Sequence, residues 1–434
     1  MFFKTVVTTL STALLCVCAK VSMAEVTSQR TWTLETSVQQ AANVSPELKI
    51  SSTEIGSYEA DMKMSGLWPD PSIEFRVDNK LGKDDRSGGV DLTDVTISQA
   101  IPFSRMKHQK SVAQSNLASV KFQQKYKALL VQTRVSKVFH ELQLASAELK
   151  LMKQRLAFAD DLNVKTKKSS QGVVVRYLTP LEKMRLSVIR EEANQAVSNA
   201  EGKYQEALNE FSKLLGIEVI ENIQVEGLQR IKQLPDLMFL YEYQENHPQL
   251  LTQMMLLQSA TSEIEVARNS QLEDPVVSLS RSQDSFDSGR DDVYALMLNI
   301  QIPLQDRKDT AVSKASYKAS EQRIEFQRLK RELEINLKRS YTHANHILEQ
   351  AESYEKKVLK PANDILKLTK KGFTSGELNM LSLVDATNTY FDSRFNYLDL
   401  LSQAHNELAD IRLYAGQLLV KDAVQLNEIN KGAH

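Results

Sequence analysis

The chain is poor in cysteine, glycine and proline, and each scarcity narrows the possible folds. Its 434 residues include two cysteines, 14 glycines and 10 prolines. Both cysteines, Cys16 and Cys18, lie in an apolar segment near the N-terminus, so we expect neither a disulfide framework nor a thiolate metal site. The low content of glycine and proline favours long helices over many short strands.

Long apolar runs and an excess of one charge are also missing. After the first few dozen residues, no window approaches the roughly 18 consecutive apolar residues that a membrane-spanning helix needs. The formal net charge is -1, which gives no electrostatic reason to expect a nucleic-acid partner.

Residues 1–24 have the three parts of a secretory signal peptide. Lys4 supplies an early positive charge, an apolar run extends from Thr5 to Cys18, and Ser22-Met23-Ala24 is a cleavage site of small residues. A short membrane anchor is the weaker alternative, because the apolar run is too short to span a bilayer. The sequence therefore predicts a secreted mature chain that begins at Glu25.

The segment from Ala128 to Ala159 predicts a long helix with two apolar sides. One stripe repeats at alternating spacings of three and four residues, which is the pattern of a coiled-coil seam. A second stripe on the opposite side contains Leu144, Ala147, Leu151 and Phe158. A helix that needs neighbours on both sides can take a place in a ring, so the pattern indicates a hollow helical barrel.

The chain repeats one order of features in two halves. Each half has a helix start with proline, an Asp-Pro step, two alternating strands, a very long helix, a turn with glycine and a shorter helix. The predicted division is a signal peptide (1–24), a first repeat (25–216), a linker (217–235), a second repeat (236–420) and a polar tail (421–434).

Four segments alternate apolar and polar residues as β-strands do. The pattern is clearest from Ile73 to Val77 and from Tyr294 to Ile302, and polar tips are expected at Asn79–Asp91 and Gln283–Asp292. Such alternation is typical of a transmembrane β-barrel and equally of a half-buried soluble sheet. Because four strands cannot close a barrel, and unpaired edges are not tolerated in lipid, we favour closure by two or three identical copies.

Together these features resemble the outer-membrane efflux protein family, the TolC-like outer-membrane factors of tripartite export systems, including those for heavy metals. The motifs that carry the resemblance occur once in each half: Asp70-Pro71 and Asp274-Pro275, Ile101-Pro102 and Ile302-Pro303, and the turns at Gly172 and Gly376. The resemblance implies an α+β membrane protein. Its fold would be a TolC-like trimer with a 12-stranded transmembrane β-barrel, four strands per chain, continued by a long periplasmic α-helical barrel.

The resemblance also implies a location and partners. The location would be the outer membrane of a Gram-negative bacterium, with the helices extending into the periplasm. The partners would be two further copies in a homotrimer, outer-membrane lipid, a periplasmic adaptor (membrane fusion) protein and an inner-membrane pump of the RND type.

Site residues follow from the same resemblance. It implies a periplasmic gate at Asp385, Ser382, Phe373 and Glu377, and adaptor docking at Gly172, Leu178, Gly376 and Leu381. Asp385 matches the second of two aspartates that line the mouth in relatives, whereas Ser382 stands where the first is expected. Three copies of Asp385 would form a carboxylate ring that attracts cations. Taken alone, Asp385 would be an ordinary polar residue on a solvated helix face, and Phe373 a hydrophobic staple at a helix end.

Neither a catalytic site nor a resident metal is expected. His343 and His346 are three residues apart on a predicted helix near Glu349, but such pairs on polar helices are more often solvated than metal-binding. The sequence has no nucleophile elbow, phosphate loop or zinc-protease motif. We therefore expect no enzyme activity and no cofactor, and the resemblance implies a passive channel for metal ions, drugs or other small molecules.

Two other functions remain open at this point. The chain could be a soluble periplasmic coiled-coil scaffold or adaptor, or, within the channel class, a type I protein-secretion duct. Recovery in an outer-membrane fraction would favour a channel, and recovery without detergent would favour the scaffold.

Overall fold

The structure, a computed structural model, describes most of the chain. The described residues are 31–78, 92–102, 105–167, 179–218, 223–270, 274–286, 289–302 and 307–419. The predicted signal peptide, the polar tail, Gly172 and Leu178 lie outside these ranges. Among the described helices, none combines the length and the apolar character needed to cross a membrane.

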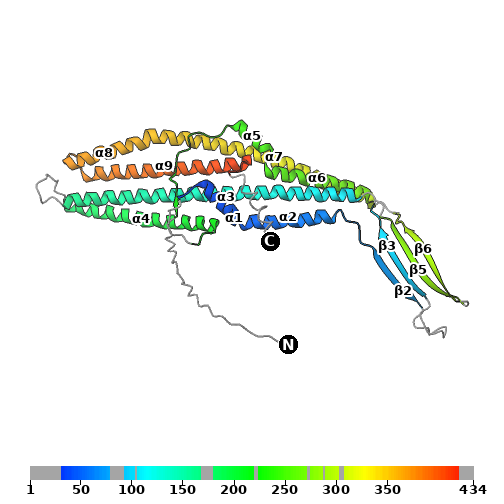
Figure 1. Cartoon of the computed structure of the whole chain (residues 1–434). Helices are drawn as coiled ribbons and strands as arrows, with labels where there is room; N and C mark the ends of the chain where they lie inside the picture. Colours follow the sequence, from blue (N-terminus) through cyan, green and yellow to red (C-terminus); the bar gives the residue numbers. More distant parts are fainter. Residues whose placement is uncertain are drawn as a thin grey trace, which may run out of the picture.

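Long helices run side by side and form most of an elongated molecule (Figure 1). The first half contains four helices, α1 (Leu34–Val44), α2 (Pro46–Met64), α3 (Arg105–Lys167) and α4 (Pro180–Leu215). The second half contains α5 (Leu237–Glu245), α6 (Pro248–Asn269), α7 (Arg307–Tyr354), the π-helix η2 (Glu355–Leu359), α8 (Lys360–Ser375) and α9 (Met380–Ala415). The element order of the first half recurs in the second, and the boundaries of the two repeats stay a prediction.

The two halves use the same kinds of residues at equivalent helix ends. α2 and α6 each have proline at the first helical position, where the missing N–H is not needed, after Ser45 and His247. α4 and α9 end at Gly216 and Gly416, which have left-handed φ angles of 62° and 75°. A Cβ at Gly216 would lie 2.6 Å from Cγ1 of Val44, and one at Gly416 would lie 3.0 Å from Cδ2 of His247. These glycines therefore end one helix and allow it to pack closely on the start of another.

The longest helix, α3, packs on two sides. Val135 and Leu142, from its first apolar stripe, belong to a buried cluster with Phe211 of α4. Leu151, from its second stripe, is buried against Phe391 of α9. The contacts agree with the expectation from periodicity that this helix has neighbours on opposite sides.

The long helix of the second half contains a π-helical turn. The very long helix expected after the second pair of strands is present, and it comprises α7, the π-helix Glu355–Leu359 and α8 in direct succession. Pro361 lies in the first turn of α8 and has no N–H to donate to the preceding turn. A π-helical turn accommodates such a break in the hydrogen-bond ladder, so the helix continues through this point without a loop.

Two hairpins form one four-stranded sheet at one end of the helices (Figure 1). β2 (Ser72–Asp78) pairs with β3 (Leu92–Ala100), and β5 (Val276–Phe286) pairs with β6 (Gly289–Asn299). β3 and β5 join the two halves, so the strand order is β2-β3-β5-β6 with antiparallel neighbours throughout. β2 and β6 are therefore the two edges of the sheet within the described chain.

One face of this sheet is apolar and exposed. The register places four apolar residues in one row across the strands: Ile73, Ile97, Leu279 and Leu296. Their exposed fractions range from 48% to 77%. The neighbouring row, on the opposite face, contains Glu74, Thr96, Ser280 and Ala295. An exposed apolar face favours strands that contact lipid over a half-buried soluble sheet.

The second hairpin is tighter than its side-chain pattern predicts. A polar tip was expected over Gln283–Asp292, but the pairing continues through Asp284 and Asp291 to Phe286 opposite Gly289. Backbone hydrogen bonds hold a ladder together whatever the polarity of its side chains, so the strands extend beyond their apolar part. The first expected tip lies largely outside the described residues.

A strap, defined here as residues 223–236, crosses the helices between the two halves (Figure 1). Near its start, β4 (Gln224–Val225) pairs in parallel with β1 (Thr31–Trp32). Further along, Arg230 donates hydrogen bonds to Glu352 at 3.0 Å and to Glu355 at 3.2 Å. The strap thus ties the first half to α7 and η2.

Candidate functional site

The turn between α8 and α9 lies at the end of the molecule away from the sheet (Figure 1). α8 ends at Gly376, whose φ of 84° reverses the chain, and the backbone N–H of Glu377 donates to the Gly372 carbonyl at 2.9 Å. Leu378 covers Gly372 so closely that an added Cβ would lie 2.8 Å from Leu378 Cδ1. These contacts fix a tight reversal, which places Gly376 and Glu377 at the helical tip.

Ser382 and Asp385 lie one turn apart at the start of α9. Asn379 is the N-cap, and its side-chain oxygen accepts from the Ser382 backbone N–H at 2.9 Å and from the Ser382 hydroxyl at 3.0 Å. Asp385 and Leu381 are exposed in the single chain. Ser382 therefore helps to begin the helix, whereas the carboxylate of Asp385 is available to solvent.

Phe373 packs between the two helical hairpins of the chain. Its side chain is 6% exposed. Its cluster combines residues from both hairpins: Leu162, Leu186, Leu366, Met380, Leu383 and Ala386. Phe373 thus helps to join α8–α9 to α3–α4, and a role for it in narrowing a pore stays a prediction.

Polar side chains link the same two hairpins near this cluster. Arg155 of α3 donates to Asn388 Oδ1 of α9 at 2.8 Å. Lys370 of α8 donates to Asp161 Oδ2 of α3 at 3.3 Å, and its ammonium lies 4.9 Å from the centroid of the Phe158 ring. The polar pairs Arg155–Asn388 and Lys370–Asp161 could not be predicted from the sequence, because a pairing between distant segments leaves no local pattern.

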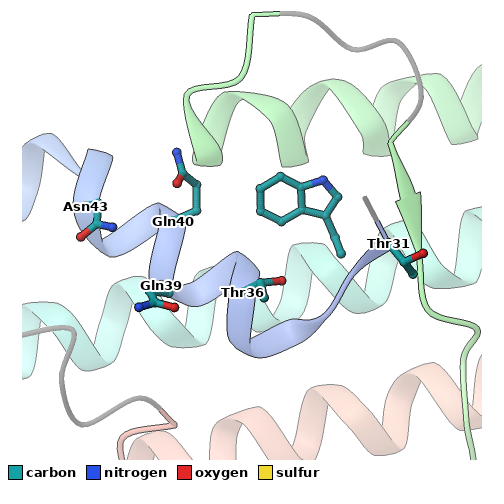
Figure 2. A pocket seen from close by; sticks show the side chains of 6 residues that line it. Thr31, Thr36, Gln39, Gln40 and Asn43 are labelled. Atoms are coloured by element: carbon teal, nitrogen blue, oxygen red, sulfur yellow. The ribbon is translucent and has the colours of Figure 1, made fainter. Parts of the chain in front are cut away.

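A hollow of about 250 Å³ lies against α1 (Figure 2). It is lined by polar residues and one indole: Thr31, Trp32, Thr36, Gln39, Gln40 and Asn43. The four residues from α1 recur at the spacing of one helix face, and Figure 2 shows them on that helix. The hollow therefore follows the polar side of an amphipathic helix, and none of its described lining residues is charged.

The histidine pair considered in the sequence does not gather further ligands. Within the described ranges, no group of three or more histidine, cysteine, aspartate or glutamate side chains is placed to hold a metal ion. His343 and His346 are both exposed, and Nδ1 of His343 lies 2.8 Å from Oε1 of Glu407 on α9. His343 thus contributes a contact between α7 and α9.

Comparison with known proteins relates this fold to a family. Residues 239–417, which extend from α5 beyond the end of α9, match the family model described as outer membrane efflux protein. The chain is related to the outer membrane efflux proteins. This finding confirms the resemblance drawn from the repeated motifs.

The matching proteins and this chain have similar lengths. The cobalt-zinc-cadmium resistance protein CzcC of Cupriavidus metallidurans is 21% identical over 389 residues, which cover 89% of this chain and 90% of CzcC. The open-state MtrE outer membrane channel of Neisseria gonorrhoeae has a TM-score of 0.72 at 16% identity, with 88% of each chain covered. The CmeC outer membrane channel of Campylobacter jejuni has a TM-score of 0.72 at 13% identity, with 92% of this chain and 89% of CmeC covered. The protein thus shares the fold of these channels along nearly its whole length.

Proposed function

We propose that this chain is the outer-membrane channel of an efflux system and conducts its substrates passively. The observation that carries the proposal is a sheet with an exposed apolar face joined to very long helices, in a relative of the outer membrane efflux proteins. α3 alone has 63 residues, which corresponds to a length of about 95 Å. The sheet would lie in the outer membrane, and the helices would cross much of the periplasm.

Three copies would complete the barrel. The edge strands β2 and β6 have backbone N–H and C=O groups that need partners in lipid. Pairing β6 of one copy with β2 of the next removes every edge. Two copies would give an eight-stranded barrel, whose interior is filled by side chains, whereas a 12-stranded barrel leaves a lumen. The trimer therefore fits a conducting channel better than the dimer.

The gate in this proposal is the helical tip. Three exposed Asp385 carboxylates around one axis would attract cations and repel anions. Opening would require the α8–α9 hairpin to part from α3, which breaks the links of Arg155 with Asn388 and of Lys370 with Asp161. Ser382, Phe373 and Glu377 would support the shape of this mouth.

The transport energy would come from elsewhere. A periplasmic adaptor would dock near Gly376 and Leu381 and, as the resemblance implies, at Gly172 and Leu178, and an inner-membrane pump would supply the energy. Divalent metal cations are the first substrates to test, because CzcC is a cobalt-zinc-cadmium resistance protein and Asp385 would favour cations.

Electrical recording of the purified mature protein tests the channel proposal. In detergent the protein should be a trimer, and in a planar bilayer it should give discrete ionic conductance steps. A water-soluble monomer that never forms pores would overturn the proposal and support the scaffold alternative. Pores that need a co-expressed secretion apparatus and pass unfolded protein, but not metal ions, would support the protein-secretion duct.

A further inference from the structure

Two histidines stack where the strap meets α3 and α9. The ring centroids of His140 and His405 are 4.2 Å apart, and the ring planes are inclined by 27°. His140 is 7% exposed, and His405 is partly buried. Neutral imidazoles can stack at this distance, whereas two imidazolium ions would repel each other strongly in a site shielded from water.

Both imidazoles take part in hydrogen bonds that hold the strap. Gln143 Nε2 donates to the Glu226 carbonyl of the strap at 2.8 Å, and Nδ1 of His140 lies 2.8 Å from Oε1 of Gln143. Nε2 of His405 lies 2.7 Å from the Gln229 carbonyl of the strap. Because both oxygens can only accept, the protons lie on His140 Nδ1 and His405 Nε2. The other nitrogen of each ring is the one that acid would protonate.

The surrounding charges do not favour protonated rings. The positive charge of Arg412 on α9 lowers the pKa of both imidazoles. Glu35 on α1 raises the pKa of Arg412 and so favours its charged form. Lys137 of α3 and Asp410 of α9 lie nearby along the same helices, but they neutralise each other at 2.7 Å. Within the described part of the chain, no carboxylate is bonded to either ring, and the strap contributes backbone carbonyls.

The pKa values of the two histidines agree with this geometry. Burial, together with the neighbouring His405, lowers the pKa of His140 from 6.5 to about 4. Burial also lowers the pKa of His405, and Arg412 lowers it further. A state that exposes these rings binds protons more readily than the packed state. The neutral rings therefore stabilise the packed state fully above about pH 6.5, and this stabilisation is lost as the pH falls toward 4.

We propose that His140 and His405 form an acid-sensitive latch, in which protonation separates the stacked rings and releases the strap from α3 and α9. If the opened latch returns His140 to an ordinary pKa, the equilibrium constant for opening rises roughly 50- to 100-fold between pH 7.5 and pH 4.5. The consequence for conduction rests on the proposed channel function. A loosened strap frees α9, and with it the α8–α9 hairpin, to move away from α3.

Hydrogen–deuterium exchange of the full-length protein in detergent tests the latch. After correction for the intrinsic effect of pH on exchange, the protection of residues 223–231 should fall by tens of fold between pH 7.5 and 4.5. The double variant His140→Gln and His405→Gln keeps side-chain hydrogen bonding but cannot titrate, so its strap protection should not depend on pH. The matched control is His343→Gln, which removes an exposed histidine at the Glu407 contact and should retain the full response.

Exchange of the histidine C2 hydrogens, followed by mass spectrometry, provides a second measurement on the unaltered protein. Both latch histidines should titrate below 6.5, and His405→Gln alone should raise the pKa of His140, because a neighbouring ring that lowers it is gone. Ordinary pKa values for both rings, or strap protection that does not change with pH, would overturn the latch. Bilayer recording separates the two proposals: an absence of pores at every pH contradicts the channel, whereas pores with a strap insensitive to pH contradict only the latch.

Discussion

Arg105 and Asp274 form an ion pair that joins the start of α3 to the segment just before β5. The carboxylate side chain is 9% exposed and that of the arginine 35% exposed, so the pair is largely removed from water. It connects the two halves of the chain where the helices meet the sheet. Nearby, the Ile101 N–H donates to the Pro275 carbonyl at 2.9 Å across the same junction.

Removal of Arg105 should weaken this junction. Arg105→Ala leaves the Asp274 carboxylate buried without this partner, and we expect a loss of about 1–3 kcal/mol in the free energy of unfolding. Arg105→Lys should lose less, because it keeps the charge. Thermal unfolding of the detergent-solubilised protein measures both. Arg328→Ala, which breaks exposed pairs on one helix, is the control and should leave the unfolding temperature nearly unchanged, because solvent screens such pairs. Equal effects of the two alanine variants would contradict a special role for the junction.

Two glycines, one at the C-cap of α4 and one inside this helix, should respond in opposite ways to alanine. Gly216 has a φ of 62°, and an added Cβ would lie 2.6 Å from Val44, so Gly216→Ala should destabilise the protein by about 1–3 kcal/mol. Gly202 lies inside the same helix with no neighbouring atom within 4 Å of an added Cβ. Gly202→Ala should therefore stabilise by about 0.5–1 kcal/mol. Denaturant unfolding curves compare the two, and a neutral Gly216→Ala would show that the helix end can shift.

A charge on the apolar face of the sheet should prevent stable insertion. Leu296→Arg places a cation on the face proposed to contact lipid, which costs roughly 2–4 kcal/mol near the middle of a bilayer. The matched variant Ala295→Arg places the same charge one residue away, on the opposite face, and should be tolerated. The folded fraction in the outer membrane, measured by heat-dependent gel mobility, distinguishes them. Similar losses for both variants would argue against a lipid-facing sheet.

Asp385 should influence which ions pass the channel. Asp385→Ala removes three carboxylates from the trimer, so the preference for cations and any block by divalent cations should fall several-fold. Reversal potentials in asymmetric salt measure the preference directly. Glu377→Ala tests whether any carboxylate at the tip has the same effect. If conductance and ion preference stay unchanged in Asp385→Ala, this residue does not belong to the gate.

The local features of the fold could be predicted from the sequence because their causes are local. The shorter helix expected after the turn at Gly376 is α9, and a capping asparagine, Asn379, and a terminal glycine, Gly416, mark its ends. The first strand, β2, likewise follows its alternation from Ser72 to Asp78. The π-helix was missed because Pro361 alone does not reveal how the preceding turn adapts.

The candidate site was only partly accessible to sequence reasoning. Asp385 and Phe373 came from a family resemblance, and the structure adds that one is exposed while the other is buried between the hairpins. The links around them were missed: Lys370 and Asp161 are 209 residues apart, and Arg155 and Asn388 are 233 residues apart. Neither pair has a spacing that a single sequence can reveal.

The sequence by itself determined the duplicated order of elements, the two apolar sides of α3 and the alternation of the strands. These properties arise from repeated spacings, which the geometry of a helix or strand converts directly into faces. Only the tertiary structure decided that β3 lies beside β5, that the strap bonds to α3, α7, η2 and α9, and that His140 stacks on His405. The hydrophobic effect is not directional, so it decides which faces are buried but not which residues pair. Each hydrogen bond or ion pair needs a specific distance and angle, which distant segments reach only after folding.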